Sequence, residues 1–503
     1  MLEAADVTRT PTRTASPTWL VVALACAGQF LVVLDVSVVN VALPSMRADL
    51  GLSAQGLQWV VNAYAIAFAG FMLLGGRAGD LYGRKRMFLV GLGLFTLASL
   101  GGGLAQQGGE LLIARAVQGL GAAVLAPSTL TILTSAVPEG AARMRAIATW
   151  SAVGAGGGAA GGLVGGALVD GLSWRWVLLI NVPVGAVVLA GSLRWLAESR
   201  NGDGRRLDLP GAVLVTAGLA TLAYGISQTE AKGWTAAATL LPLAAGLALI
   251  AVFLLVEART TAPLMPLGLF RVRAVSSANA SMFLTGFAMF CMWYFMTLYA
   301  QNVLDYSPLE AGLALVPSSL AIVLGSKLAP RFMPVLGARN LAALGTLIAV
   351  AGFAWQSAMT SRGAYLTEIM FPGILMMLGA GLTATPLAAL ATSGAAPGEA
   401  GLVSGLINTS RTMGGSLGLA VMSTIAAART GDSGTPGALT DGYALVFRTG
   451  VGVLLAGVAL MLVWLPRKTA AEKAKKAGTA GTAEAAEAAG TAGTGTGSKS
   501  SAG

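Results

Sequence analysis

Charged side chains are scarce in this sequence, and their scarcity excludes a water-soluble protein. Of the 503 residues, 11% are charged and 55% are hydrophobic, and the mean hydropathy is +0.73. Soluble globular chains carry about 25% charged residues. A chain this poor in charge cannot cover a surface that faces water, so lipid must be the solvent around most of it.

The sequence has no histidine and no phosphate-binding loop motif. Without histidine the chain can hold no His-based metal site, catalytic triad or histidine proton relay. The dipeptide Gly-Lys does not occur, so the G-x-x-x-x-G-K-[ST] cradle for ATP phosphates is absent. Cys26 and Cys291 lie in apolar runs and predict no disulfide. We therefore expect no enzyme, no metal or cofactor, and an ion gradient as the energy source.

The hydrophobic residues are arranged in fourteen long runs. A helix that crosses about 30 Å of hydrocarbon needs about 20 mostly apolar residues. We therefore predict an all-α polytopic membrane protein with fourteen transmembrane helices. The predicted helices cover 19–43, 57–76, 87–106, 111–134, 148–169, 176–196, 209–227, 236–256, 276–299, 311–330, 339–357, 366–389, 402–427 and 443–465.

The net charge of +10 comes from short basic clusters between these runs, which argues against a nucleic-acid partner. If the N-terminus is inside, most loop Lys and Arg are cytoplasmic, as the positive-inside rule requires. An even number of helices then places both tails, 1–18 and 466–503, in the cytoplasm of a bacterial cell. The second tail is rich in Ala, Gly, Thr and Lys and is predicted to be disordered.

A glycine pattern recurs eight helices apart, as GGLVG at 161–165 and GGSLG at 414–418. Parallel repeats about an axis along the membrane normal are one way in which transporters are built. The repeat predicts a six-helix bundle at 19–196, a linker with two extra helices at 197–275, and a second six-helix bundle at 276–465.

The segment GRAGDLYGRKR at 76–86 follows the second predicted helix. Glycine allows a tight turn, and Asp80 can pair with an arginine. The spacing resembles the cytoplasmic signature loop of the major facilitator superfamily, with Ala78 where a leucine is usual. That resemblance implies a gating latch, whereas the plainer alternative is an ordinary basic loop. The latch residues would be Gly76, Asp80, Gly83, Arg84, Lys85 and Arg86.

Asp35 is the one acid that lies well inside an apolar run. A carboxylate inside a membrane is costly and indicates a function, unless it only caps or bonds a neighbouring group. Its segment LDVSVVNVALP at 34–44 resembles the first-helix signature of drug:proton antiporters. The segment from Leu111 to Ala123, which contains Arg115, resembles the fourth-helix motif linked to proton coupling in the superfamily.

Helix geometry allows Asp35 and Arg115 to meet. Asp35 lies about nine residues, or about 13 Å, from the outer end of its helix, and Arg115 about five residues, or about 8 Å, from the outer end of its own. A direct or water-bridged pair is possible at these depths. A change in their separation would alter how readily Asp35 holds a proton, and could load and release one during transport.

The fifth predicted helix carries glycines at a spacing that makes a flat face for close packing. The pattern resembles the antiporter motif g-x-x-x-G-P-x-x-G-G, with Gly162 in place of its proline, which removes a fixed kink. The resemblance favours export, and a simple packing helix is the alternative. The residues are Gly157, Gly161, Gly162, Gly165 and Gly166.

Taken over 19–465, the chain resembles the fourteen-helix drug:proton antiporter family of multidrug and antibiotic exporters. The resemblance implies a monomer that exports a lipophilic drug by alternating access, conferring resistance. The predicted helix at 57–76 and those from 236–256 to 443–465 show no second clearly buried acid, which favours a monovalent or neutral lipophilic drug over a dication. A metabolite importer of the same fold and a non-transporting membrane sensor remain alternatives. Asn40, Gln118, Asn408 and Arg411 are candidates to line the cavity. For Arg411 the equal alternative is packing against a backbone carbonyl.

Overall fold

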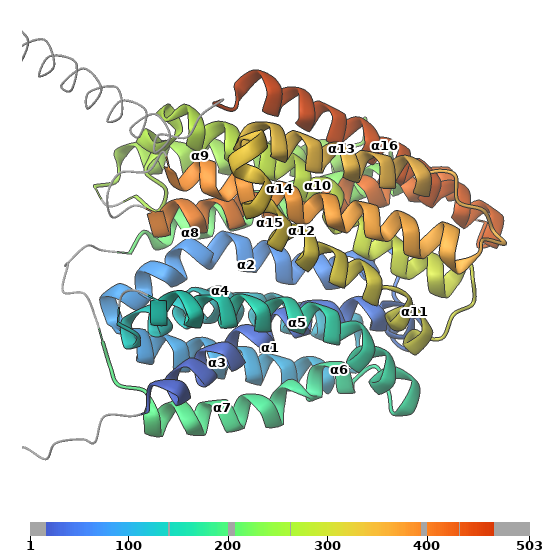
Figure 1. Cartoon of the computed structure of the whole chain (residues 1–503). Helices are drawn as coiled ribbons and strands as arrows, with labels where there is room; N and C mark the ends of the chain where they lie inside the picture. Colours follow the sequence, from blue (N-terminus) through green and yellow to red (C-terminus); the bar gives the residue numbers. More distant parts are fainter. Residues whose placement is uncertain are drawn as a thin grey trace, which may run out of the picture.

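The computed structural model describes residues 17–138, 141–199, 207–261, 263–393, 400–431 and 433–466. Within these ranges the chain forms helices and no strands, which confirms the predicted all-α class. The long helices run side by side, and residues 17 and 466 lie at the same end of the molecule (Figure 1). We call this end the terminal face and the other end the opposite face.

Six crossings form the first bundle. Most of its turns are short, because glycine or polar caps end one helix and begin the next. Ser53, for example, accepts the backbone N–H of Gly56 at 3.0 Å at the start of the second helix. The helices are α1 (Thr18–Leu50), α2 (Ala54–Tyr82), α3 (Arg84–Gly103), α4 (Gly108–Ala136), α5 (Ala141–Gly171), α6 (Trp176–Leu179) and α7 (Asn181–Trp195).

The second bundle repeats this arrangement with two interrupted crossings. One is broken at Leu315, which precedes Pro317, and the other begins with a π-helical turn. The elements are η1 (Leu267–Arg271), α10 (Arg273–Asn302), α11 (Pro308–Ala314), α12 (Val316–Leu336), α13 (Ala338–Gln356), η2 (Leu366–Met370), α14 (Phe371–Ser393), α15 (Ala400–Thr430) and α16 (Pro436–Trp464).

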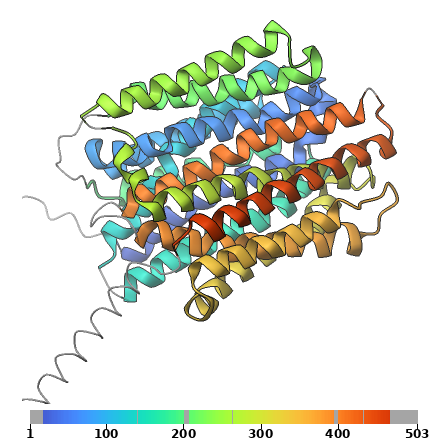
Figure 2. The ribbon, with the colours of Figure 1, turned by 90° about the horizontal axis from the view of Figure 1, so that it is seen from above.

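Two further helices, α8 (Leu209–Lys232) and α9 (Ala237–Arg259), lie between the bundles in sequence and at one edge of the body in space (Figure 2). The α8 helix packs on both α2 and α15, and α9 packs on α8. A Cβ atom at Gly70 of α2 would collide with Thr216 of α8, so this glycine sets how closely the two helices approach. The inserted pair therefore covers a seam between the two bundles.

With α6–α7, α11–α12 and η2–α14 each taken as one, the described residues form fourteen long helical segments, which is the number predicted. Thirteen of the candidate spans are both long and strongly apolar. The remaining crossing is α15, whose 31 residues include serines, threonines, Asn408 and Arg411. At 1.5 Å per residue it is about 46 Å long, which is enough to cross the membrane.

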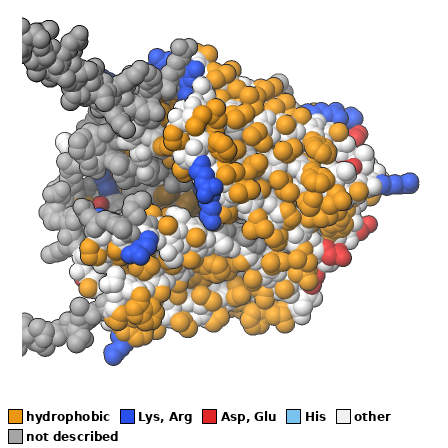
Figure 3. Space-filling model, viewed as in Figure 1, with side chains coloured by type: hydrophobic (Ala, Val, Ile, Leu, Met, Phe, Trp, Pro, Cys, Tyr) orange, Lys and Arg blue, Asp and Glu red, His pale blue; other side chains and the backbone are white. Residues whose placement is uncertain are grey.

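The outer surface between the two faces is apolar. Large hydrophobic side chains are exposed there, among them Leu97, Ile113 and Leu241, each more than two-thirds exposed. Hydrophobic side chains cover the middle of the molecule, and charged ones lie mainly toward its ends (Figure 3). A surface of this extent needs lipid to cover it.

Two sequence predictions need correction or lie beyond the description. The segment at 76–86 is not a loop, because α2 continues to Tyr82 and α3 begins at Arg84. Gly83 alone breaks the helix, with a φ of 107° that favours glycine. Of the predicted tails, residues 1–16 and 467–503 lie outside the described residues.

Candidate transport site

Asp35 of α1 and Arg115 of α4 form a buried ion pair inside the first bundle. Arg115 Nη1 donates to Asp35 Oδ2 at 2.7 Å. Asp35 is 0% exposed and Arg115 is 2% exposed. The two side chains therefore meet directly, at the depth that helix geometry allowed.

Two amides complete the environment of the Asp35 carboxylate. Gln118 Nε2 donates to Asp35 Oδ1 at 2.6 Å, and Asn181 Nδ2 donates to the same oxygen at 2.9 Å. Gln118 Nε2 also donates to Ser99 Oγ at 2.7 Å. Since each of these amide and guanidinium groups acts as a donor toward Asp35, the arrangement fits the ionised carboxylate.

Arg115 is held in place by α2 as well as by Asp35. Its Nε donates to the carbonyl oxygen of Val60 at 3.1 Å, and its Cζ lies 4.4 Å from the centre of the Tyr64 ring. Gly119 lets the two helices approach, because a Cβ atom there would lie 2.3 Å from the Tyr64 carbonyl oxygen. The charge pair thus joins α1, α2 and α4, and any tilt of one helix against another must disturb it.

Sequence reasoning found the two charges but not the whole cluster. Gln118, predicted to line the cavity, is 1% exposed and belongs to the ion-pair cluster instead. Asn181, Ser99 and Tyr64 were not assigned to the site. Their only signal is that each is a polar side chain within an apolar run, and such residues are common where helices pack in membranes.

The glycines of α5 serve two different contacts. Gly157, Gly161 and Gly165 face α1, where a Cβ atom would meet Phe30, Ser37 and Val38 respectively. Gly162 and Gly166 face the second bundle: a Cβ atom would lie 3.0 Å from the Gly312 oxygen and 2.5 Å from the Leu309 Cα. The motif therefore packs α5 within its own bundle and also against α11 of the other one.

One set of contacts between the bundles lies at the opposite face. The backbone N–H of Leu309 donates to Asp170 Oδ2 at 3.2 Å, and Gln301 Nε2 donates to the Val41 carbonyl at 2.9 Å. The hydrophobic cluster that includes Val38 and Leu298 also joins the two bundles there.

Toward the terminal face the same side of α5 is uncovered. Ala148, Ser151 and Ala152 share the helix face of Gly162 and Gly166, by the spacing of the helical turn, and all three are exposed. The surface is hollowed at this end of the molecule (Figure 3). On the α5 side the bundles are therefore closed at the opposite face and open toward the terminal face, whereas α2 and α15 also meet in the terminal half, where Gly405 lies against Leu73.

The predicted latch residues tie together parts of the first bundle. Arg84 Nη2 pairs with Asp80 Oδ1 at 3.2 Å, and Lys85 Nζ donates to the carbonyl oxygens of Leu193 and Leu196 at 2.8 and 2.7 Å. The backbone N–H groups of Lys85 and Arg86 each donate to Glu198 at 3.1 Å. Gly83 lies against Glu198, and Gly76 lies near Pro127 of α4. These contacts fix α2, α3, α4 and the end of α7 to one another.

The other predicted cavity residues lie on two helices. Asn40 of α1 is half-buried and donates to the Val36 carbonyl at 2.9 Å. Asn408 of α15 is half-buried and donates to the Ser404 carbonyl at 3.3 Å. Arg411 of α15 is exposed, although it lies near the middle of its helix.

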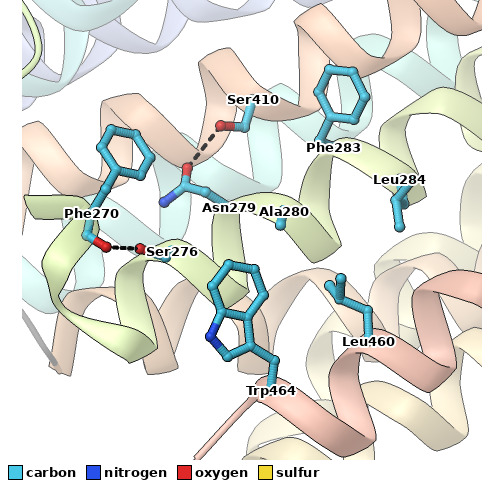
Figure 4. A pocket seen from close by; sticks show the side chains of 9 residues that line it. All are labelled: Phe270, Ser276, Asn279, Ala280, Phe283, Leu284, Ser410, Leu460 and Trp464. Carbon is cyan, nitrogen blue, oxygen red and sulfur yellow. Dashed lines mark hydrogen bonds between the residues drawn. The ribbon is translucent and has the colours of Figure 1, made fainter. Parts of the chain in front are cut away.

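A separate apolar pocket of about 650 Å³ lies between η1, α10, α15 and α16 (Figure 4). Ser410 Oγ donates to Asn279 Oδ1 at 2.8 Å on one wall, and Trp464 projects from α16 on another. None of the residues predicted for proton coupling lines this pocket. It is therefore distinct from the charge cluster.

The prediction that the helices from 236–256 onward hold no second buried acid is wrong for α9, and a further buried acid precedes α8, outside that prediction. Glu257, near the end of α9, is 3% exposed, and Asp208, the N-cap of α8, is 4% exposed. Asp208 Oδ1 accepts Gly211 N and Glu257 Oε2 accepts Met265 N, and the remaining oxygen of each is buried without a partner. Glu257 was missed because it lies two residues before Arg259 and looks like part of a loop.

Two bundles of long apolar helices that meet at one face, with a buried charge pair inside the first of them, are the architecture of a polytopic membrane transporter. A family model described as Major Facilitator Superfamily matches residues 25–419. The chain belongs to that superfamily.

Relatives similar to this chain extend over nearly its whole length. The cephamycin export protein CmcT of Amycolatopsis lactamdurans is 48% identical over 88% of this chain and 91% of that protein. The puromycin resistance protein pur8 of Streptomyces alboniger is 38% identical over 90% and 92%. Among solved structures, the nucleoside transporter NupG matches with a TM-score of 0.65 at 12% identity, over 89% of this chain and all of that one. The last match shows the fold alone.

Proposed function

We propose that the protein is a proton-coupled antiporter that exports an antibiotic or related drug across the bacterial cytoplasmic membrane and thereby confers resistance. The observation that carries this proposal is the buried cluster of Asp35 and Arg115, which joins three helices of one bundle. The similarity to export and resistance proteins supports the cargo class. We place the terminal face in the cytoplasm, because the positive-inside rule favours that orientation.

In this scheme the structure is the inward-open state after proton release. The ionised Asp35 is neutralised by Arg115 and accepts further hydrogen bonds from Gln118 and Asn181. Drug enters from the cytoplasm while this pair holds the charge. Outward opening tilts α1 against α4 and separates Asp35 from Arg115. An unpaired carboxylate in the membrane is costly, so Asp35 then takes a proton from outside.

In this scheme the glycines of α5 form the contact that closes the outer side of the transporter. Gly162 and Gly166 let α5 and α11 close the outer side in the inward-open state. The latch around Asp80, Gly83 and Arg84 keeps α2, α3 and α4 moving as one body. In this proposal the transporter needs no cofactor, because the proton gradient supplies the energy. It works as a monomer.

The proposal is tested by drug transport in proteoliposomes under an imposed pH difference. The wild-type protein should accumulate a transported antibiotic against its gradient, and Asp35→Asn should abolish that accumulation. Asp49→Asn is the matched control, because Asp49 lies on the same helix and also pairs with an arginine, Arg175, at 2.6 Å. Accumulation by the wild type that ignores the pH difference would contradict proton coupling.

A further inference from the structure

Arg411 of α15, in the second bundle, carries a positive charge that no described acid neutralises. Arg411 makes no ion pair and its side chain makes no hydrogen bond with any residue that the structure describes. Among the described acids, only Asp35 lies in the middle third of a membrane-crossing helix, and Arg115 already pairs with it. Arg411 is therefore left without an acidic partner among the described residues. Lys327 of α12 and Arg448 of α16 also lie near the middle of their helices without an ion pair to a described acid, and Arg448 donates to the Ser357 carbonyl at 3.4 Å.

Arg411 is directed to the space between the bundles and not to lipid. On α15, Gly414 and Gly418 pack against the Phe283 and Phe287 backbone of α10, and Gly405 lies against Leu73 of α2. At 100° per residue, the direction of Arg411 falls between these two contact directions. The other side of α15 is covered by α8, through a cluster that includes Ala420.

The neighbours of Arg411 on this face combine polar and aromatic groups. Ser404 and Asn408 precede it at helical spacing, so all three side chains share one side of α15. One turn further on, Gly415 is covered by the Phe290 ring, which a Cβ atom at that glycine would meet at 2.4 Å. A guanidinium with an amide on one side and an aromatic ring on the other suits an acidic group attached to an apolar body.

We infer that Arg411 anchors the acidic group of the exported compound, so that the carrier takes organic anions, carboxylates above all. This inference rests on the proposed function and names the charge class of its cargo. An unpaired guanidinium inside a membrane is costly. Here the opening at the terminal face keeps it hydrated until an anion replaces the water. A carboxylate offers the bidentate geometry that arginine prefers.

The test measures binding to the purified full-length protein with three probes: cefoxitin, which carries a carboxylate, its methyl ester, and the amine puromycin. The wild type should bind the acid at least about tenfold more tightly than the ester, as loss of a charge-assisted bond predicts. Arg411→Gln should remove that preference, while Arg411→Lys should retain most of it. Arg429→Gln is the control, because Arg429 lies on the same helix but is exposed and paired with Asp441.

Three results would overturn the inference. They are equal affinities for acid and ester in the wild type, tightest binding of the amine, and an unchanged acid preference in Arg411→Gln. Failure to bind the acid at all counts against it in the same way. None of these outcomes touches the dependence of drug transport on a pH difference, so the export proposal stands or falls separately.

Discussion

The two bundles treat their interior arginines in opposite ways. Arg115 in the first bundle is 2% exposed, pairs with Asp35 and is bonded to α2. Arg411 in the second bundle is exposed and has no partner among the described residues. An ion pair between two helices can be broken when the helices move, which changes the free energy of each charge. An exposed charge without a protein partner can be neutralised only by a ligand or an ion. We therefore assign proton coupling to the first bundle and cargo recognition to the second.

The largest effect is expected from removing Arg115, the arginine that is paired. Arg115→Gln leaves Asp35 buried without its cation, which should cost about 3–5 kcal/mol of stability unless Asp35 binds a proton. Transport should be lost. The double variant Asp35→Asn, Arg115→Gln should recover part of the stability but no transport, as measured by thermal unfolding in detergent. Additive losses in the double variant would mean that the pair is not coupled.

The contact between the bundles is the next most sensitive point. Gly166→Ala places a methyl group 2.5 Å from the Leu309 Cα, so the outer side can no longer close fully. Transport should fall about tenfold or more, an effect of about 1.4 kcal/mol. A cysteine at Leu309 should also react faster with a membrane-impermeant maleimide. Gly156→Ala is the control, because nothing lies within 4 Å of that position, and it should behave as wild type.

The sequence predicted the charge pair better than it predicted the helix contacts around the pair. Fourteen apolar runs set the helix count, and the rise of a helix placed Asp35 and Arg115 at compatible depths. Which face of α5 meets the other bundle depends on tertiary packing, which spacing alone does not show. The helical continuation of α2 through Asp80 was missed because a polar, glycine-rich segment reads as a loop. The lack of an acidic partner for Arg411 among the described residues is visible only once the described acids have been placed.

The amide of Asn181 allows a smaller change to the environment of the Asp35–Arg115 ion pair. Asn181→Ala removes one of the hydrogen bonds to the Asp35 carboxylate, at 2.9 Å. The loss should cost about 1–2 kcal/mol and slow coupled transport about five- to thirtyfold. Asn340→Ala, at the exposed start of α13, serves as the control in the same vesicle assay. An unchanged rate would show that Asn181 does not support the ionised carboxylate.

The smallest effect on stability is expected at Asp208 and Glu257, two acids that are buried together without an ion pair to a described basic residue. Glu257→Gln supplies an amide donor beside the unpartnered Asp208 Oδ2, so the protein should be stabilised by about 1 kcal/mol. Transport should not change. Asp441→Asn, at an exposed ion pair, should leave the unfolding temperature unchanged. A lower unfolding temperature for Glu257→Gln would mean that the two acids already share a proton favourably.

The most direct test of the coupling account is proton release on drug binding. Purified protein in weakly buffered detergent solution is mixed with a transported antibiotic while a pH indicator reports free protons. The wild type should release protons as drug binds, and Asp35→Asn should bind drug and release none. Proton release that persists in Asp35→Asn, or drug binding by the wild type with no release at any pH, would contradict the account.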